Sequence, residues 1–362
     1  MTDNSPALRI LCIGETWFGS DARAAFAALR KLGHSVHVID ETHFVPIEWQ
    51  SLATRAVRKI FRKAMIGELT RHSVRVMDLF RPDAVFVFKG NHVSPDILEA
   101  ARERGIISVN YYPDVSFMAH GAEIPRALLR YDHVFNTKTY GVEDMKKHGV
   151  QSVSFMPPGY DPELHQPVAL TDADRSRFGC DVSFIGTWSP KKEKILAELR
   201  EALPQMHLRV WGCQWEKRVT RSLDSAVMGM EIVGEDYTRA ICASSICLGI
   251  LSEARTGASS GDLITARTFQ IPACGTFMLH ERNSEVLEYF REGEEAEFFS
   301  DGRELASKVQ HYLDNPTERS RIAEGGLSRS HQGGYSIENR MREVADWVRA
   351  RQRNAGVGRA AE

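Results

Sequence analysis

The fold of this chain is indicated by one stretch, LRILCIGETWFGSDARAAFAALRK, which spans residues 8–31. Its first part, Leu8–Ile13, is an apolar run of the length expected for a buried β-strand. A turn with two glycines follows, and Asp21–Lys31 then repeats apolar or small residues at helical spacing. A strand that enters a helix through a short turn is the repeating unit of a parallel, doubly wound sheet.

Apolar runs alternate with helical patterns along most of the 362 residues. The strands predicted in the first half are Leu8–Ile13, Ser35–Ile39, Ala84–Phe88, Ile106–Asn110, His133–Phe135 and Ser152–Phe155. Those predicted in the second half are Asp181–Ile185, Leu208–Trp211, Glu231–Val233, Ile246–Leu251, Phe277–Leu279 and Ala296–Phe299. Because one open sheet rarely holds so many strands, we expect an α/β protein with two Rossmann-like, doubly wound domains that face a central cleft.

The alternation pauses at the proline-rich stretch Pro157–Pro162 and the polar stretch Thr171–Arg177, which predict a linker. We therefore expect an N-terminal domain over 1–165 and a C-terminal domain over 175–335. A C-terminal helix is expected over 336–352, and packing on the N-terminal domain is one arrangement for it. Small and polar residues predict a flexible tail over 353–362.

Composition excludes several classes of protein. Hydrophobic residues make up 43% and charged residues 26%, which is ordinary for a globular chain, and a net charge of -2 gives no overall basic field for nucleic acid. The longest charge-free apolar stretch, Ile241–Leu251, is shorter than the roughly 20 residues that cross a bilayer. The N-terminus lacks the pattern of a signal peptide, and the six cysteines include no Cys-x2-Cys pair. A cytoplasmic location with free thiols is the expectation.

Three loops of the first half follow predicted strands and carry polar residues toward the expected cleft. The first contains Gly14, Glu15 and Trp17, and is either a cleft wall or a plain strand–helix turn. It lacks the lysine of a phosphate-binding P-loop and the second glycine of a dinucleotide-binding turn. The second loop, Lys89–His92, offers His92 as a base or as a hydrogen-bonded structural histidine. The third offers Asp114 as a base or as a turn carboxylate.

In the second half, the loop after Ile185 contains Gly186 and places Lys191 and Lys192 at the start of a predicted helix. Positive charge is unfavourable at a helix N-terminus, so this arrangement indicates either a bound phosphate or a solvated basic turn.

A glycine-rich loop at 257–262 enters a predicted helix that stops before Pro272. The amides of Ser260 and Gly261 would suit a phosphate or a hydroxyl-rich ligand, and Arg267 adds a cation. On one helix, Asp262 and Gln270 would be about 12 Å apart, a separation that spans much of a nucleotide-sugar. In the alternative interpretation, Asp262 only caps this helix.

Several of these motifs resemble a known family. They are LRILCIG, RKLGH, PPGYD, FIGTWSPKK, and RTFQIPACG with the later His280-Glu281-Arg282, and they are similar to those of CgeB-like (spore-maturation-type) group 1 glycosyltransferases. The similarity runs from about residue 8 to residue 348. The resemblance implies the two-domain GT-B fold, with a nucleotide-sugar donor on the C-terminal domain and the acceptor side on the N-terminal domain.

Residue by residue, the resemblance places Lys192 at the donor pyrophosphate and Asp262 and Gln270 at the family's Glu-x7-Glu pair, which reads sugar and ribose hydroxyls. This chain departs from the family there, and Thr187 replaces its usual arginine. The donor-binding set expected is Gly186, Lys191, Lys192, Ser260, Gly261, Asp262, Arg267 and Gln270. The acceptor-side set is Gly14, Glu15, Trp17 and Lys89, and the catalytic candidates are Asp114, His92 and Asp262.

The expected activity is transfer of a sugar, of hexosyltransferase type, from a nucleoside diphosphate to an unidentified glycan, lipid-linked glycan or protein, as in polysaccharide biosynthesis. No resident cofactor, metal or nucleic-acid partner is expected. A non-catalytic GT-B-shaped binding protein and a nucleotide-sugar epimerase remain alternatives. The basic stretch Arg55–His72 is either a packed amphipathic helix or a peripheral contact with the anionic inner face of a membrane.

Overall fold

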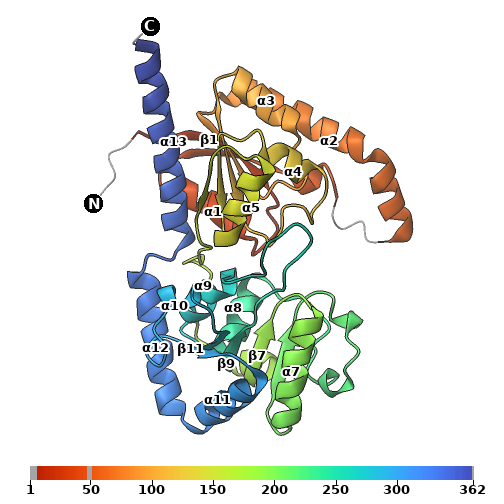
Figure 1. Ribbon diagram of the computed structural model, residues 1–362, viewed down its shortest axis with the longest axis vertical. Helices are drawn as coiled ribbons and strands as arrows, with labels where there is room; N and C mark the ends of the chain where they lie inside the picture. The colour runs from red at the N-terminus through yellow and green to blue at the C-terminus, as the bar shows by residue number, and fades with distance from the viewer. Residues whose placement is uncertain (1–5, 47–50, 361–362) are drawn as a thin grey trace. The chain divides into compact units, whose positions relative to one another are not determined.

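A computed structural model describes residues 6–46 and 51–360 of the chain. The chain divides into two compact units (Figure 1). Unit 1 comprises Met1–Pro157, Ala254–Ser260 and Glu338–Glu362, and unit 2 comprises Pro158–Glu253 and Gly261–Ile337.

Unit 1 contains a parallel sheet of six strands in the order β2-β1-β3-β4-β5-β6. The strands are β1 (Arg9–Gly14), β2 (Ser35–Asp40), β3 (Ala84–Phe88), β4 (Ile107–Tyr112), β5 (His133–Asn136) and β6 (Val153–Phe155). The helices are α1 (Asp21–Lys31), α2 (Leu52–Phe80), α3 (Pro95–Glu103), α4 (Glu123–Leu128), α5 (Thr139–His148) and α13 (Ile337–Ala360), with a 3-10 turn η1 (Glu41–His43). Helices cover both faces of the sheet, as Figure 1 shows.

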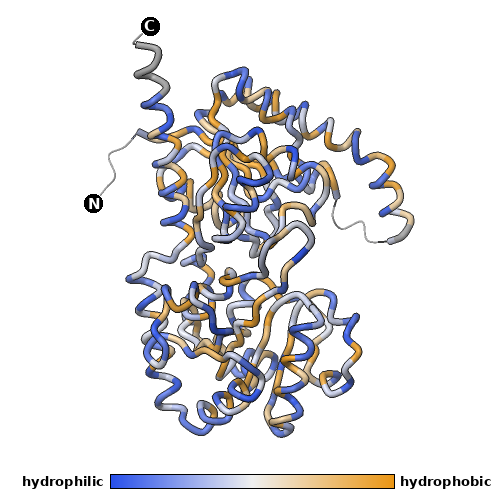
Figure 2. Tube along the Cα trace, in the orientation of Figure 1, coloured by the Kyte–Doolittle hydropathy of each residue, from blue (hydrophilic) through white to orange (hydrophobic). Residues whose placement is uncertain are grey.

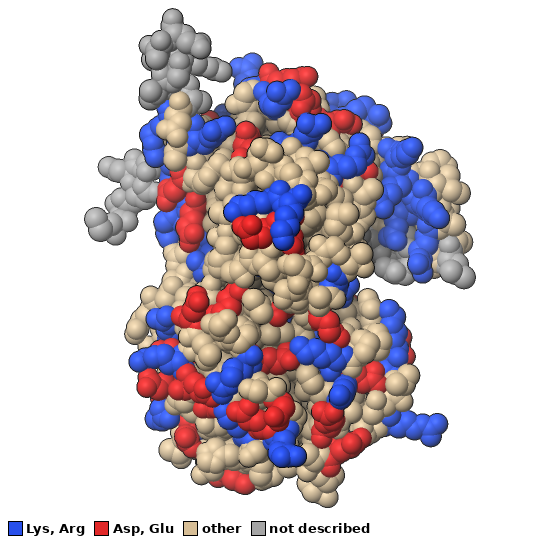
Figure 3. Space-filling model, viewed as in Figure 1, with Lys and Arg blue, Asp and Glu red and all other residues tan. Residues whose placement is uncertain are grey.

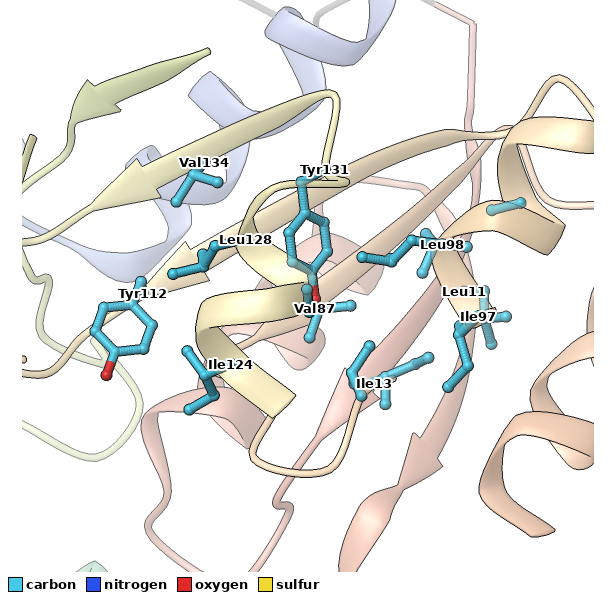
Figure 4. Packing of buried hydrophobic residues seen from close by; sticks show 14 of the residues in the cluster. Leu11, Ile13, Val87, Ile97, Leu98, Tyr112, Ile124, Leu128, Tyr131 and Val134 are labelled. Atoms are coloured by element: carbon cyan, nitrogen blue, oxygen red, sulfur yellow. The ribbon is translucent and has the colours of Figure 1, made fainter. Parts of the chain in front are cut away.

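The core of unit 1 lies between the central strands and their helices. Every residue of β3 is buried, which explains its unbroken apolar sequence. Figure 4 shows Leu11, Ile13 and Val87 from the sheet beside side chains of α3 and α4. Burial of each such aliphatic side chain stabilises the unit by roughly 1.5–3 kcal/mol.

Helix α13 completes unit 1. The ring of Trp347 stacks on His133 with 4.6 Å between centroids, and Gln352 Nε2 donates to Asp83 Oδ1 at 3.3 Å. Near its start, Glu338 pairs with Lys31 at 2.9 Å. The backbone stays helical to Ala360, through most of the segment predicted as a tail, and residues 361–362 lie outside the described residues.

Unit 2 contains a parallel sheet of five strands in the order β11-β10-β9-β7-β8. The strands are β7 (Cys180–Ile185), β8 (Leu208–Trp211), β9 (Ser244–Gly249), β10 (Met278–Glu281) and β11 (Glu297–Phe299). The helices are α6 (Asp172–Phe178), α7 (Pro190–Ala202), α8 (Gly234–Cys242), α9 (Ala266–Ala273), α10 (Val286–Tyr289), α11 (Gly302–Asp314) and α12 (Pro316–Gln332), with 3-10 turns η2 (Trp215–Lys217) and η3 (Arg221–Leu223). Figure 2 shows the strands of both units as mainly hydrophobic segments between helices of mixed hydropathy.

The predicted α/β class with two parallel sheets is confirmed. Two local predictions are wrong. Residues 231–233 form no strand, because Gly234 takes a positive φ of 60° and the chain turns directly into α8. Most of Thr171–Arg177 is helix rather than linker, because Thr171 and Asp174 form a capping box and Phe178 is buried at the end of α6.

Among the residues that the structure describes, no helix combines the length and apolar composition needed to cross a membrane. Within the same residues, no three His, Cys, Asp or Glu side chains gather as a set of metal ligands.

Candidate functional site

In each sheet, successive strands are added first on one side of a central strand and then on its other side, and the place where the order reverses is the switch point. In unit 1, β2 and β3 lie on opposite sides of β1, and in unit 2, β8 and β9 lie on opposite sides of β7. Loops at the carboxyl ends of the strands diverge at such a point, which is where parallel α/β sheets bind ligands. Most of the site residues predicted from sequence lie in these loops.

In unit 2, Lys192 joins the loops after β7 and β9. Its side chain is 3% exposed, and Nζ donates to Thr187 O at 3.1 Å and to Ser252 Oγ at 3.0 Å. Ser189 caps α7 by accepting from Lys192 N at 3.4 Å. The loop that the sequence analysis associates with phosphate is therefore fixed by its own lysine.

Carboxylates of the chain itself bind both the side chain and the backbone amide of Lys191. Lys191 Nζ pairs with Glu281 Oε1 at 2.8 Å, and Lys191 N donates to Glu253 Oε1 at 3.0 Å. Burial acts to raise the pKa of Glu253, but hydrogen bonds from Ser189 and from backbone amides, together with the charge of Lys192, lower it below the ordinary value. The positive charge of Lys191, unfavourable at a helix start, is thus compensated by Glu281, a partner that could not be identified from the sequence.

Glu193 holds the same loop through hydrogen bonds to its carboxylate. Its carboxylate accepts from Trp188 Nε1 at 2.7 Å, from Val219 N at 2.8 Å and from Thr220 N at 2.7 Å. Burial acts to raise the pKa of Glu193, but these hydrogen bonds lower it below its usual range. The charged carboxylate therefore holds the β7 loop and the segment after η2 together.

Arg267 is the cation best placed for an anionic ligand in unit 2. Its guanidinium lies over the Phe184 ring, 5.3 Å from the centroid, and donates to Ile250 O at 3.1 Å. Its Nε is buried and has no hydrogen-bond partner within the described part of the chain. Gly186 makes room for it, because a Cβ there would lie 2.9 Å from Arg267 Nη1. Burial lowers the pKa of this guanidinium, which favours a compensating anion.

Helix α9 starts later than predicted. It begins at Ala266 with Thr265 as N-cap, and Thr265 N donates to Thr268 Oγ1 at 3.0 Å. Asp262 lies in the loop before it, so the interpretations of Asp262 as helix cap and of one helix carrying Asp262 and Gln270 are wrong. Pro272 lies inside α9, which ends at Ala273 rather than before the proline.

The remaining donor-side residues lie around α9. Gln270 is 7% exposed, and its Oε1 accepts from Tyr237 Oη at 2.7 Å. Asp262 N donates to Ser252 O at 2.9 Å, which ties this loop to β9. Gly261 belongs to unit 2, whereas Ser260 ends the segment that clusters with unit 1.

His280 organises the motif on which the resemblance most depends. It is fully buried, Nδ1 faces Glu281 O at 2.7 Å, and Nε2 lies 2.9 Å from Thr268 Oγ1. Burial lowers its pKa to about 4, so the ring is neutral at pH 7. A Cβ at Gly249 would lie 2.2 Å from the ring, so only glycine fits there. His280 therefore has a structural role beneath the β9 and β10 loops.

In unit 1, the loops after β1 and β3 meet through Glu15, whose Oε1 accepts from Asn91 Nδ2 at 2.6 Å. Gly14 precedes it in a tight position, since a Cβ would lie 3.1 Å from Phe26 and 3.2 Å from Phe88 O. Trp17 is 46% exposed. The acceptor-side residues predicted in this loop therefore lie at the switch point of the sheet.

Asp114 is held between two basic side chains. Its Oδ2 lies 2.9 Å from Lys89 Nζ and 3.2 Å from His120 Nε2. Burial acts to raise its pKa, but Lys89 and His120 lower it below the ordinary value. Lys89 itself adopts a left-handed φ of 62°. Asp114 is thus a paired, ionised carboxylate, and His120 is a neighbour that the sequence analysis missed.

Glu41 is a buried carboxyl group that the sequence analysis also missed. It is inaccessible to solvent and accepts from His92 N at 2.8 Å and from Asn91 N at 3.2 Å. Burial and the nearby Glu15 raise its pKa to about 8. Only its place directly after the second strand could have suggested it.

His92 lies on the floor of a pocket of about 630 Å³ in unit 1. Its Nδ1 is buried without a hydrogen-bond partner among the described residues. Burial and the charges of Arg62 and Arg58 lower the pKa of its ring to about 4. The pocket is lined by Glu15, Val45, Arg55, Ala56, Arg58, Lys59, Arg62, Asn91, His92 and His120.

Most of unit 2 lies within a segment that is similar to a known family. Residues 191–346 match the profile of a family described as glycosyl transferase-like. This segment includes Lys191, Lys192, Arg267 and the His280-Glu281-Arg282 motif. A search of curated protein sequences gave no match.

Solved structures share the fold over nearly the whole chain. Sucrose-phosphate synthase from Thermosynechococcus elongatus superposes with a TM-score of 0.64 at 14% identity, covering 94% of this chain and 99% of that one. HepE from Anabaena, in complex with UDP and glucose, gives a TM-score of 0.64 at 13% identity, with 95% and 100% covered. A putative UDP-N-acetylglucosamine 2-epimerase from Listeria monocytogenes gives 0.52 at 12% identity, with 90% and 94% covered.

The chain therefore has the GT-B fold, and residues 191–346 are similar to a glycosyl transferase-like family. The family match supports the predicted glycosyltransferase class, and the solved structures confirm the predicted GT-B fold.

Proposed function

We propose that this chain is a glycosyltransferase that takes a sugar from a nucleoside-diphosphate-sugar donor bound to unit 2 and gives it to an acceptor bound to unit 1. One observation carries the proposal. Arg267 has a buried Nε, without a hydrogen-bond partner in the described part of the chain, beside Gly186 at the switch point of the sheet and within the glycosyl transferase-like segment. HepE, which shares the fold, was solved with UDP and glucose, and this supports the same donor class here.

In the proposed reaction, the bond between the anomeric carbon and the diphosphate oxygen breaks, and a bond to an acceptor hydroxyl oxygen forms. The hydroxyl proton leaves to a base or to the departing diphosphate. Arg267 would stabilise the negative charge that develops on the diphosphate, with help from the amide of Gly261. Lys192 would act by fixing the β7 and β9 loops, because its ammonium donates to Thr187 and Ser252.

Asp262 and Gln270 are proposed to contact the sugar and the ribose of the donor. The proposed base is His92 or Asp114. His92 has a ring nitrogen without a hydrogen-bond partner among the described residues, whereas Asp114 is committed to Lys89 and His120. A general base must have a lone pair free to accept the proton, so the uncommitted nitrogen favours His92 over the paired Asp114.

A thermal-shift titration with nucleoside diphosphates tests the donor site. A ligand at ~100 times its Kd adds about 2.7 kcal/mol of stability. We expect at least one nucleoside diphosphate to raise the Tm, and Arg267→Ala to abolish most of that rise. Arg303→Ala is the matched control, because Arg303 is exposed on α11. If no nucleoside diphosphate shifts the Tm of the wild type, the proposed donor site is wrong.

The two donor contacts are separable by mutation. Asp262→Asn should reduce transfer and leave diphosphate affinity nearly unchanged. Gln270→Ala should weaken diphosphate and donor binding by a factor of roughly 2–13, the value of one neutral hydrogen bond. Equal loss of diphosphate affinity in Asp262→Asn and Arg267→Ala would show that the two ends of the donor are wrongly placed.

An epimerase of nucleotide-sugars is the second candidate, because the fold is also similar to that of the Listeria protein. Product analysis with a labelled donor separates the two activities. Label in a new glycoside supports the transferase, an isomerised donor supports the epimerase, and unchanged donor would indicate a binding protein.

Finer assignments remain proposals: the CgeB-like subgroup, a hexosyl donor, a role in polysaccharide biosynthesis and a cytoplasmic location. Peripheral contact with an anionic membrane is supported by the start of α2, where Val57, Ile60 and Phe61 are 40%, 74% and 54% exposed beside basic residues. Weak binding to anionic vesicles that disappears at high salt is the expected result.

A further inference from the structure

A concentration of positive charge lines the pocket of unit 1. Arg55, Arg58, Lys59 and Arg62 all belong to α2 and all line this pocket. Their spacing of three and four residues places them on one face of the helix. Figure 3 shows Lys and Arg side chains gathered over the start of α2.

These four cations have no carboxylate partner among the described residues. Arg58 donates to Pro46 O at 3.0 Å, and no ion pair joins any of the four to a described Asp or Glu. Further along α2, by contrast, Arg71 pairs with Glu68. Like charges on one helix face repel one another, so this face is more stable with an anion bound.

The other side of the pocket is suited to hydroxyl groups. Glu15 and Asn91 lie there, hydrogen-bonded to each other, and His92 has a buried ring nitrogen that no described residue contacts by a hydrogen bond. Glu15 is the one carboxylate among the ten lining residues, so positive charge dominates the pocket. A volume of about 630 Å³ is within the usual range for small-molecule sites.

We propose that this pocket binds a phosphate group carried by the acceptor, with the α2 cations holding the phosphate and the side of Glu15 and His92 facing the hydroxyl part. The inference rests on the proposed function and assigns its acceptor to phosphorylated hydroxyl compounds. Guanidinium groups suit this task because their planar donors match phosphate oxygens in pairs. A soluble sugar phosphate and a lipid-linked phosphate share this chemistry.

The test is calorimetric titration of the full chain at saturating UDP with inorganic phosphate, glucose 6-phosphate, and decyl phosphate below its micelle concentration. We expect one of the two organic phosphates to bind at least tenfold more tightly than inorganic phosphate. Tighter binding of glucose 6-phosphate indicates a soluble acceptor, and tighter binding of decyl phosphate indicates a lipid-linked one. Absence of binding by all three overturns the inference.

Paired variants locate the binding. Arg58→Gln with Arg62→Gln should weaken binding of the preferred phosphate at least tenfold. The control, Lys63→Gln with Arg75→Gln, removes the same charge from exposed positions of α2 that do not line the pocket, and should change affinity less than twofold. Equal weakening in both double variants would show non-specific attraction and contradict the inference.

UDP affinity, measured in the same variants, keeps the two proposals apart. It should stay unchanged in both double variants, because the substituted residues all belong to unit 1. Normal UDP binding without phosphate binding overturns the pocket alone. Phosphate binding without UDP binding overturns the transferase and leaves an anion site in unit 1.

Discussion

Glu41 and Glu193 are buried carboxyl groups behind the switch points of the two sheets, and their pKa values are shifted in opposite directions. Glu193 receives three hydrogen bonds, from Trp188, Val219 and Thr220, and its pKa is lowered. Glu41 receives two backbone hydrogen bonds, but burial and Glu15 raise its pKa to about 8. Burial alone therefore does not determine the charge of a carboxyl group; the number of donors and the sign of its neighbours do.

The basic side chains of the two units also differ, in whether the protein itself supplies their partners. Lys191 and Lys192 are held by groups of unit 2 itself, whereas Arg55, Lys59 and Arg62 face a pocket without described carboxylate partners. Paired charges fix loops, and charges without an internal partner are available to a ligand. The following experiments test this distinction.

The largest effect is expected from Glu41→Gln. The folded pKa of about 8 lies above the ordinary 4.5, so between these pH values the folded state keeps a proton that the unfolded state has lost. The stability supplied by this protonated group is fully present below about pH 4.5 and is lost as the pH rises through 8. Relative to the wild type, Glu41→Gln should therefore gain on the order of 2–4 kcal/mol at pH 8. Urea unfolding at pH 5, 6.5 and 8 measures the difference.

Glu193→Gln is the control for Glu41→Gln and should have the opposite sign. Its folded pKa is lowered, so its contribution is present above the ordinary pKa of 4.5 and is lost as the pH falls through the folded value. Glu193→Gln should therefore be less stable than the wild type at pH 8. Stabilisation by both substitutions at pH 8 would contradict the comparison.

Lys192→Met should lower the free energy of unfolding by about 1.5–3 kcal/mol, because it removes charged donors from Thr187 O and Ser252 Oγ. Lys59→Met, at an exposed position, should change it by less than about 0.5 kcal/mol. Urea midpoints of the two variants give the comparison. Equal midpoints would mean that the buried lysine does not fix its loops.

Gly186→Ala should displace the guanidinium of Arg267, since the new Cβ would lie 2.9 Å from Nη1. A loss of UDP affinity of about tenfold, or about 1.4 kcal/mol, is expected by titration. Gly14→Ala is the matched variant in unit 1, where the Cβ would meet Phe26 and Phe88, and it should leave UDP affinity unchanged. If Gly14→Ala weakened UDP binding and Gly186→Ala did not, the donor would be assigned to unit 1 instead of unit 2.

The smallest effect is expected from Lys191→Met. Its pair with Glu281 is 36% and 16% exposed, and such pairs contribute at most about 1 kcal/mol. Thermal unfolding in low and high salt should show a small destabilisation that shrinks as salt is added. A large, salt-independent loss would indicate that Lys191 is as integral to the fold as Lys192.

The strands and helices could be predicted because the patterns that specify them lie within short stretches of consecutive residues. The predicted strand Ala84–Phe88 and the predicted helix Asp21–Lys31 have the same bounds in the structure, since apolar periodicity and caps are written in consecutive residues. The start of α9 was missed because Thr265 and Thr268 cap it more directly than Asp262.

The sequence predicted which loops form the candidate site, but not which of their residues contact one another. Glycines and charged residues after strands marked the correct turns, but Lys191 and Glu281 are 90 residues apart, and Glu41 and His92 are 51 apart. The order of the strands in a sheet brings such pairs together, and this order cannot be read from a single sequence. The roles of Asp114, Asp262 and Gln270 stay predictions.

Helix α13 has a consequence for the order in which the protein is made. It follows the whole of unit 2 in the sequence, yet its Trp347 and Gln352 contact His133 and Asp83 of unit 1. During synthesis, at about 5–20 residues per second, the sheet begun first waits for a helix that leaves the ribosome after unit 2. The nascent sheet of unit 1 meanwhile exposes the surface of His133 that Trp347 later covers, so unit 1 can complete its packing only after unit 2 has been translated.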